Sequence, residues 1–363
     1  MDTNTDYSDE WISSTKALQL VKPYMSIEWL HTSIKEVQLR RITGGFTNRL
    51  YLLTRTTPSI KEPACILIRF FGIQGPLQDP PESNTTLSST EQALVYYEMG
   101  RRGWGPKLYG TFRGGRLEEW IDAHPLTPEE SKDPVIRRDI ARSYARLHML
   151  LLPIACSFSQ PLLHELKSLG QRAEEFAQCL LVNSEERVRE FANVLKSTDW
   201  TSELGWVFAL FVKHSCQFAF VIGDANYLNV LVKNHKSECQ VMLIDYETLI
   251  HGPRGFDIGG HFNERMYCYD GQDNVLSGHP APDLQEQLLF CKEYLREEHS
   301  LSRELADRDT VAHLLIESKI GRLFHILYSV LMCFSGGLTE KPALLAGLTH
   351  MMTMYHHLKA DFN

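Results

Sequence analysis

The sequence lacks an excess of positive charge. Its 363 residues include 37 Lys and Arg against 45 Asp and Glu, for a formal net charge of −8. Sequence-independent nucleic-acid binding normally requires a basic surface that neutralises phosphates. The charge balance therefore argues against a nucleic-acid partner, although it leaves room for a local basic patch that contacts phosphate.

The sequence also lacks any pair of cysteines in a CxxC spacing. Each of its eight cysteines lies among apolar or helical residues. We therefore expect buried, reduced thiols in a reducing compartment, not a disulfide framework. The cysteines are Cys65, Cys156, Cys179, Cys216, Cys239, Cys268, Cys291 and Cys333.

Long hydrophobic runs are absent as well. The most apolar late segment, LFHILYSVLMCF (residues 323–334), has 12 residues and contains a histidine. It is too short to span a bilayer and predicts a buried helix. The N-terminal segment MDTNTDYSDEW is acidic and polar, so we expect no signal peptide. These absences favour a cytoplasmic protein without a membrane span, while peripheral attachment stays open.

Alternation and turn residues dominate the first third of the chain. VQLRRITGGFTNRLYLLTR alternates on both sides of Gly44 and Gly45, which predicts a β-hairpin. ACILIRFFG predicts a third strand, and PKLYGTF and GRLEEWI predict two more around Gly114 and Gly115. TEQALVYYEMGRRG predicts a helix that ends at a glycine. We therefore expect residues 1–122 to form a β-rich lobe.

Helical periodicity dominates after that point. TPEESKDPVIRRDIARSYARLHML predicts a helix that begins at Thr127, and most of the chain after Phe256 is also helical in pattern. Three predicted strands, AFVIGD, LNVLV and CQVMLID, interrupt these helices. We predict an α+β, protein-kinase-like two-lobe fold, with a mainly helical lobe over residues 123–363.

Two acids and an amide surround the short strands of the second lobe. Asp224 and Asn229 are five residues apart, and Asp245 and Glu247 follow the next strand. Phosphoryl transfer from ATP needs a group that orients the acceptor hydroxyl and takes its proton, and oxygen ligands for magnesium. A kinase-type catalytic loop supplies these groups at this spacing. The alternative, ordinary turn residues at strand ends, explains either aspartate alone better than it explains the whole set.

Several long motifs resemble the choline/ethanolamine kinases. VMLIDYETLIHGPRGFDIGGHFNE is similar to that family's ID(F/Y)E followed by RxFDIxNHFxE, and GDANYLNVLV matches its catalytic loop. ITGGFTNRLYLL resembles its opening hairpin, and GPKLYGTFRGGRLEEWI its stretch up to the hinge between lobes. The resemblance covers roughly residues 36 to 270 in colinear order.

The resemblance implies roles for the residues of the second lobe. Asp224 would accept the proton of the alcohol, and Asn229 and Asp245 would bind Mg²⁺ with support from Glu247. Apart from the resemblance, we expect Asp257 to cap a helix and to brace the loop that contains Asp224.

The resemblance also implies an ATP-binding role for the first lobe. Arg69 would reach the phosphates, with Glu91 as its ion-pair partner, although an ordinary salt bridge of Arg69 is the alternative. Thr47 and Asn48, which follow the Gly-Gly turn, would cover the phosphates. Glu119 and Ile121 would offer backbone groups to adenine at the hinge.

The sequence departs from the family pattern at the catalytic loop and in the acceptor site. Ile222 stands where the family has a histidine, so we expect a looser base position. Glu264 and Tyr269 match the family's acid and an aromatic residue near the substrate cation. Arg265 replaces a tryptophan, and His325 and Tyr328 replace a pair of tryptophans. The cage for the cation is therefore thinner and more polar, unless His325 and Tyr328 are simply core residues.

From these residues we predict ATP-dependent phosphorylation of choline, ethanolamine or both, in phosphatidylcholine and phosphatidylethanolamine synthesis. A kinase for another small hydroxyl compound is one alternative, motivated by Arg265 and the missing tryptophans. A catalytically weak, nucleotide-binding pseudoenzyme is the other, motivated by Ile222. The sequence does not determine the preferred alcohol, the regulation or the oligomeric state, for which a homodimer is one expectation. Outside the site we expect Arg254 to pair with an acid and His148 to be a packed core residue.

Overall fold

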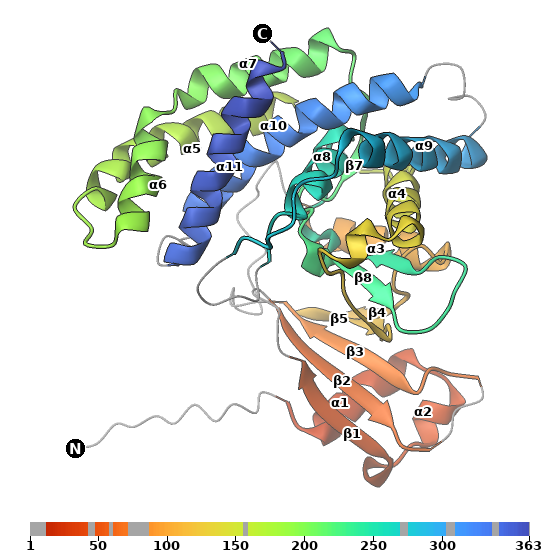
Figure 1. Ribbon diagram of the computed structural model, residues 1–363. Coiled ribbons are helices and arrows are strands. Elements are labelled where there is room, and N and C mark those ends of the chain that lie inside the picture. Colours follow the sequence, from red (N-terminus) through yellow and green to blue (C-terminus); the bar gives the residue numbers. More distant parts are fainter. Residues whose placement is uncertain are drawn as a thin grey trace, which may run out of the picture. The chain divides into compact units, whose positions relative to one another are not determined.

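The computed structural model describes residues 12–42, 48–57, 61–71, 87–154, 159–268, 275–302, 309–335 and 341–362 (Figure 1). The chain divides into two compact units. The first comprises Met1–Ser83 and Ser88–Asp122, and the second comprises Asn84–Leu87 and Ala123–Asn363.

The first unit is built on a five-stranded antiparallel sheet with strand order β1-β2-β3-β5-β4. Its strands are β1 (Val37–Ile42), β2 (Arg49–Arg55), β3 (Cys65–Phe70), β4 (Leu108–Phe112) and β5 (Gly115–Glu119). Its helices within the described ranges are α1 (Ser14–Val21), α2 (Ile27–His31) and α3 (Ser89–Arg101). The predicted hairpin of β1 and β2 is confirmed, while its Gly-Gly turn lies outside the described residues.

Local sequence explains the turns and the core of this unit. The β4–β5 turn needs Gly114, whose φ of +85° is a left-handed conformation that glycine adopts without strain. Apolar residues that alternate along β3, such as Ile66 and Ile68, are fully buried. They pack in one cluster with Trp29 of α2 and Leu117 of β5. The sheet therefore buries one face against the N-terminal helices.

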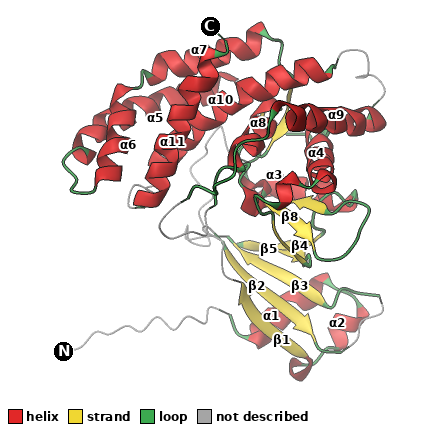
Figure 2. Ribbon diagram, in the orientation of Figure 1, coloured by secondary structure: helices red, strands yellow, loops and turns green. Residues whose placement is uncertain are grey.

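The second unit is mainly helical, with two small sheets (Figure 2). One sheet has strand order β6-β8-β9, and the other pairs β7 with β10. The strands are β6 (Ala123–Pro125), β7 (Phe218–Val221), β8 (Val230–Lys233), β9 (Val241–Leu243) and β10 (Ile250–Pro253). The helices described here are α4 (Pro134–His148), α5 (Ser159–Leu180), α6 (Glu186–Ser197), α7 (Trp200–Lys213), α8 (Gly255–Glu264), α9 (Leu284–Leu301), α10 (Val311–Ser335) and α11 (Pro342–Ala360).

Two sequence predictions for this unit need correction. The helix expected from Thr127 begins only at Pro134, because Asp133 caps it by accepting the backbone N–H of Val135 at 2.7 Å. Strands β6 and β10 were not predicted, since each is short, includes a proline and has no clear alternation. Strand β10 is the antiparallel partner of β7, and β8 forms a hairpin with β9.

The cysteine prediction holds only in part. The cysteines that the structure describes are free, and Cys216, Cys291 and Cys333 are buried. Cys179 is exposed because the buried face of α5 is formed by residues such as Ala177 and Leu180. Cys156 lies outside the described residues. Among the described helices, none is long and apolar enough to cross a membrane. The segment of residues 323–334 lies in α10, where side chains such as Leu323 and Leu327 belong to the core.

Helices α8 and α10 approach each other closely at glycines. A Cβ atom at Gly321 of α10 would overlap the carbonyl oxygen of Gly255, which belongs to α8. Such contacts to backbone cannot be relieved by moving a flexible side chain. The close packing bears on the predicted site because α8 carries Glu264, one of the predicted site residues, and Asp257, the expected brace of the loop that contains Asp224.

We therefore expect Gly321→Ala to lower the free energy of unfolding by about 3 kcal/mol or more, at the upper end for overpacking of a core. Gly205→Ala in α7 is a matched control, because its Cβ would meet only Lys167 Nζ, at 3.7 Å. There alanine should raise stability by about 0.5–1 kcal/mol through its better helix propensity. Urea unfolding measures both changes, and equal effects at the two glycines would contradict the packing argument.

Candidate active site

A short loop after β7 brings the first predicted site residues together. Gly223 turns the chain with φ of +73°, and Asp224 follows it. The side-chain amide of Asn229 donates to Asp224 Oδ2 at 3.0 Å and to the Asp224 carbonyl at 3.1 Å. Asn226 Nδ2 donates to Asp224 Oδ1 at 3.2 Å. Two amides thus fix the orientation of a single carboxylate.

The surroundings of Asp224 make it a better base than an exposed aspartate. Burial raises the pKa of Asp224, and hydrogen bonds from Asn229 and Asn226 oppose the rise only partly. The negative charge of nearby Asp257 raises the pKa further. A carboxylate with a raised pKa that is still ionised near neutral pH binds a proton more readily.

The β8–β9 hairpin carries the second predicted acid to the same place. Val230 pairs with Leu243, and the backbone N–H of Ile244 donates to the Asn229 carbonyl at 3.0 Å. Asp245 follows directly, with φ of +64° and ψ of +60°. This left-handed conformation is uncommon for a residue other than glycine, and such backbone outliers concentrate at functional sites. Glu247 lies two residues on, in a half-buried 3-10 turn.

The donor set at this point fits Mg²⁺. The amide nitrogen of Asn229 is used by Asp224, which leaves its oxygen as the group that could reach a cation. Asp245 adds a carboxylate, and Mg²⁺ prefers such oxygen ligands together with waters. The described residues contain no group of three or more His, Cys, Asp or Glu side chains that could hold a metal. Any ion here would therefore need waters or phosphate oxygens as further ligands.

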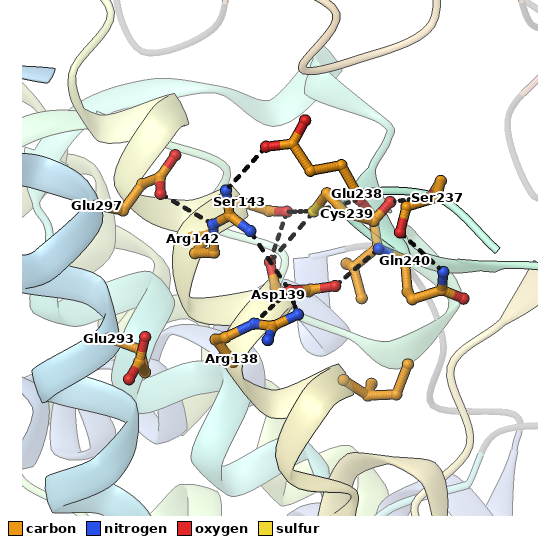
Figure 3. Close-up of polar contacts among 12 residues, drawn as sticks. Arg138, Asp139, Arg142, Ser143, Ser237, Glu238, Cys239, Gln240, Glu293 and Glu297 are labelled. Carbon is orange, nitrogen blue, oxygen red and sulfur yellow. Dashed lines mark hydrogen bonds and ion pairs between the residues drawn. The ribbon is translucent and has the colours of Figure 1, made fainter. Parts of the chain in front are cut away.

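The far end of the same hairpin is fastened to α4 (Figure 3). Asp139 is fully buried and accepts the backbone N–H of Gln240 at 2.8 Å. Figure 3 shows Arg138 and Arg142 of α4 turned toward this carboxylate, with Arg138 Nη2 at 2.8 Å from Asp139 Oδ1. The sequence analysis did not single out Asp139, whose partner in the hairpin is about a hundred residues away. This attachment fixes the hairpin that positions Asn229 and Asp245.

A buried aspartate, Asp257, holds the backbone of the loop that carries Asp224. Asp257 accepts the backbone N–H of Ile222 at 2.8 Å and that of Gly223 at 2.9 Å. Thr248 Oγ1 donates to the Ile222 carbonyl at 2.9 Å. Both backbone groups of Ile222 are therefore hydrogen-bonded, although its side chain can only pack. The expected brace is present, but Asp257 does not cap its helix, because it lies in the first turn and the N-cap of α8 is Arg254.

Two of the residues expected near the substrate cation lie together. Glu264 of α8 and His325 of α10 are both 3% exposed, with His325 Nε2 at 3.7 Å from Glu264 Oε1. Burial lowers the pKa of His325 to about 4, so the imidazole is neutral at pH 7. A Cβ atom at Gly260 would contact both the His325 ring and Ala225. The imidazole thus lies close to the loop that carries Asp224.

Tyr328 and Arg265 stand at positions where the sequence analysis found the family's tryptophans replaced. The Tyr328 ring packs edge-on against Phe256 at 5.1 Å, and burial, with a contribution from Asp224, raises the pKa of its hydroxyl to about 12. Arg265 is buried and forms a bidentate pair with Glu286 at 2.8 and 2.7 Å. Its guanidinium is therefore engaged by α9. Tyr269 lies outside the described residues.

In the first unit the predicted ion pair of Arg69 with Glu91 is wrong. Arg69 Nε donates to Glu118 Oε1 at 2.7 Å, and Arg116 Nε donates to the same oxygen at 2.6 Å. Burial opposes the charge of Glu118, but the two guanidiniums outweigh it and lower its pKa. Glu91 instead closes a capping box with Ser88 at the start of α3. Strand pairing of β3 with β5 supplied a nearer acid than the helix did.

The other predicted nucleotide contacts of this unit are backbone groups and a loop residue. The N–H of Glu119 donates to the Lys107 carbonyl at 2.9 Å, so this backbone group is engaged within the lobe. Ile121 follows β5 and is half-buried, as is Asn48 before β2. Thr47 lies outside the described residues.

Comparison with known proteins agrees with this arrangement. Residues 39–336 match the family model described as choline/ethanolamine kinase. Human choline/ethanolamine kinase is 28% identical over 314 residues, which cover 83% of this chain and 74% of the relative. The rat protein of the same name is 27% identical over 291 residues, covering 78% and 69%.

Solved structures show the same fold. Choline kinase from Cryptosporidium parvum superposes with a TM-score of 0.71 at 17% identity and covers 96% of each chain. Plasmodium vivax ethanolamine kinase gives a TM-score of 0.62 at 17% identity, over 95% of this chain and 89% of the other. The predicted fold, a β-rich N-terminal lobe and a helical C-terminal lobe of the protein-kinase-like type, is therefore confirmed.

Proposed function

Because the chain belongs to the choline/ethanolamine kinase family, we propose that it transfers the γ-phosphoryl group of ATP to the hydroxyl of choline or ethanolamine. The observation that carries the proposal is the pair formed by Asp224 and Asn229, hydrogen-bonded at 3.0 Å beside Asp245. This arrangement supplies a base and oxygen ligands in one place. We place the reaction in phosphatidylcholine and phosphatidylethanolamine synthesis, in the cytoplasm.

Asp224 performs the proton transfer in this proposal. Its ionised carboxylate accepts a hydrogen bond from the acceptor hydroxyl and takes the proton as the bond to phosphorus forms. Asn229 and Asp245, supported by Glu247, would hold Mg²⁺, which when bound neutralises charge on the phosphates. The amides of Asn226 and Asn229 keep the carboxylate in one orientation, so the hydroxyl meets a positioned base.

The nucleotide is assigned to residues of the first unit. Arg69, Thr47 and Asn48 contact the phosphates, and the backbone at Glu119 and Ile121 contacts adenine. The support for Arg69 is its place in β3, where its Nε donates to Glu118 at 2.7 Å, since a guanidinium oriented in this way can bind phosphate through charge-assisted hydrogen bonds. In this proposal Glu91 caps α3 and has no role in binding the nucleotide.

The ammonium group of the acceptor is assigned to Glu264, with Tyr269 and Tyr328 as aromatic faces and neutral His325 beside them. An aromatic face attracts a quaternary ammonium, and a carboxylate attracts either kind of ammonium. A kinase for another small hydroxyl compound is the alternative, favoured by the engagement of Arg265 with Glu286 where the family has an aromatic residue.

A competition experiment decides between these acceptors. Purified protein with MgATP would receive choline, ethanolamine or a neutral alcohol of similar size, alone and in pairs, and phosphorylated products would be measured by mass spectrometry. The proposal requires product from choline or ethanolamine and none from the neutral alcohol. Preference for the neutral alcohol would favour the alternative.

Asn229→Leu removes both the amide that orients Asp224 and the oxygen proposed for magnesium. We expect kcat to fall roughly 10²-fold, the scale that misplacement of a catalytic group by about an ångström costs. The Mg²⁺ concentration for half-maximal rate should rise at the same time.

Asn226→Ala is the control, since it removes a hydrogen bond to Asp224 but no proposed metal ligand. It should reduce kcat without changing the Mg²⁺ dependence. An Mg²⁺ requirement that is unchanged in Asn229→Leu would contradict the ligand role.

A further inference from the structure

His148 is a buried imidazole that the proposed reaction does not use. It is the last residue of α4, and its side chain is 1% exposed. Its Nε2 lies 3.2 Å from Asp257 Oδ2, and its Nδ1 lies 2.9 Å from the hydroxyl of Tyr294 in α9. The expectation of a packed core histidine is correct for its burial, but both ring nitrogens are engaged in polar contacts.

The partners determine which nitrogen of His148 carries the proton. The Asp257 carboxylate already accepts two backbone N–H groups, and as an acceptor it takes a further hydrogen bond from His148 Nε2. Burial keeps the pKa of Tyr294 well above its ordinary value, so its hydroxyl retains the proton and can donate to Nδ1. The imidazole therefore links the Tyr294 hydroxyl of α9 to the Asp257 carboxylate of α8.

The hydrogen bonds that Asp257 accepts come from two places, the loop before Asp224 and the His148 side chain. Asp257 accepts the N–H groups of Ile222 and Gly223, which precede Asp224, and it accepts His148 Nε2. The carboxylate is fully buried, so losing one of its three donors would leave a charge with too few partners. Its orientation would then no longer be fixed, and its hydrogen bonds to the loop would weaken.

We propose that His148 is a positioning residue for the base Asp224, acting through Asp257. The imidazole fixes the carboxylate from outside the loop, at a place where Ile222 offers no hydrogen-bonding side chain of its own. The kinetic consequence rests on the proposed kinase function. The effect on the hydrogen bonds of the loop does not rest on it.

Hydrogen–deuterium exchange of the peptide that covers residues 220–226 tests the proposal directly. His148→Phe keeps an aromatic ring but removes the donor, and should speed exchange of this peptide roughly tenfold or more, as loss of a hydrogen bond to a buried carboxylate predicts. His148→Gln can place an N–H near the position of Nε2 and should restore slow exchange. Likewise, kcat should fall in His148→Phe and recover in His148→Gln, while KM for MgATP stays unchanged in both variants.

A second pair of variants controls for general damage to the core. Tyr294→Phe removes the donor to Nδ1 and should speed exchange of the same peptide. Tyr355→Phe also removes a buried hydroxyl, the one that donates to Glu203 at 2.5 Å, but should leave residues 220–226 unchanged. If His148→Phe does not fold, this pair carries the test.

Unchanged exchange of residues 220–226 in folded His148→Phe, or in Tyr294→Phe if the former does not fold, would overturn the proposal. So would a glutamine variant that is as impaired as the phenylalanine variant. If the wild-type protein turns over no acceptor, the kinase function fails, while the exchange data still decide whether His148 holds the loop.

Discussion

Replacing Asp224 with asparagine is expected to reduce kcat by about 10³-fold, within the range that general-base catalysis contributes. Asparagine keeps the size of the side chain but cannot accept the proton of the acceptor hydroxyl. KM for MgATP should change little, because the substitution leaves the residues proposed to hold the nucleotide and Mg²⁺ in place. The variant should also remain folded, since asparagine has nearly the same shape as aspartate.

Asp199→Asn provides the control for this substitution. Asp199 caps α7 by accepting the N–H of Ser202 at 3.0 Å, and asparagine is an equally good cap. Its kcat should therefore equal that of the wild type. Retention of kcat within tenfold of the wild-type value in Asp224→Asn would rule out Asp224 as the base.

The pH dependence gives a second check on the same residue. Burial raises the pKa of Asp224, and Asp257 adds to the rise, so the base is lost as pH falls through a value above the ~3.9 of an exposed aspartate. The acid limb of the kcat profile should lie correspondingly high. It should disappear from the residual activity of Asp224→Asn.

The largest effect on stability is expected from Arg254→Leu. Arg254 is 1% exposed and binds Asp309 at 2.6 and 2.7 Å, Glu298 at 3.0 Å and Glu317 at 2.5 Å. Leucine would leave three buried carboxylates without their cation, and removing one partner of a buried ion pair typically costs about 3–5 kcal/mol. The loss should also affect the site, because Arg254 immediately precedes α8.

The cost of Arg254→Leu should depend on pH with a definite sign. Burial raises the pKa of Glu298 from 4.5 to about 7, with Arg254 opposing the rise and Asp309 adding to it. Because the folded pKa is the higher one, the contribution of Glu298 to stability is complete below pH 4.5 and is lost as pH rises through about 7. Without Arg254, the repulsion among the carboxylates grows over the same range, so the variant should be more destabilised at pH 8 than at pH 6.

Urea unfolding at the two pH values measures this difference. Arg296→Leu serves as the control, since Arg296 is 79% exposed and its pair with Glu293 spans 3.7 Å. Exposed pairs of this kind contribute about 0–1 kcal/mol. If Arg254→Leu costs no more than Arg296→Leu, the buried cluster does not stabilise the fold.

The parts of the fold that were predicted correctly are those with a local signal. Alternation identified β1 to β5, and helical periodicity identified α4 and the long helices after Phe256, which are α9, α10 and α11. Strands β6 and β10 were missed because they are short, contain proline and depend on partners elsewhere in the chain. The start of α4 was misplaced because Thr127 and Glu130 form a local capping arrangement that resembles a helix start.

In the candidate site, too, only the residues with a local sequence signal could be predicted. Asp224, Asn229 and Asp245 could be found because they lie within 22 residues of one another, at a spacing set by one loop and one hairpin. The supporting contacts could not be found in this way. His148 lies 109 residues from Asp257, and no spacing rule links them. The choice of Glu91 over Glu118 for Arg69 failed for the same reason, since only strand pairing reveals the nearer acid.

Release of ADP from MgATP by the wild-type protein tests the central claim most directly. The rate should be compared with choline, with ethanolamine and with no acceptor. The account predicts release that depends on one or both amino alcohols and is lost in Asp224→Asn. Release that is independent of any amino alcohol, or its absence with both in protein that binds MgATP, would contradict it.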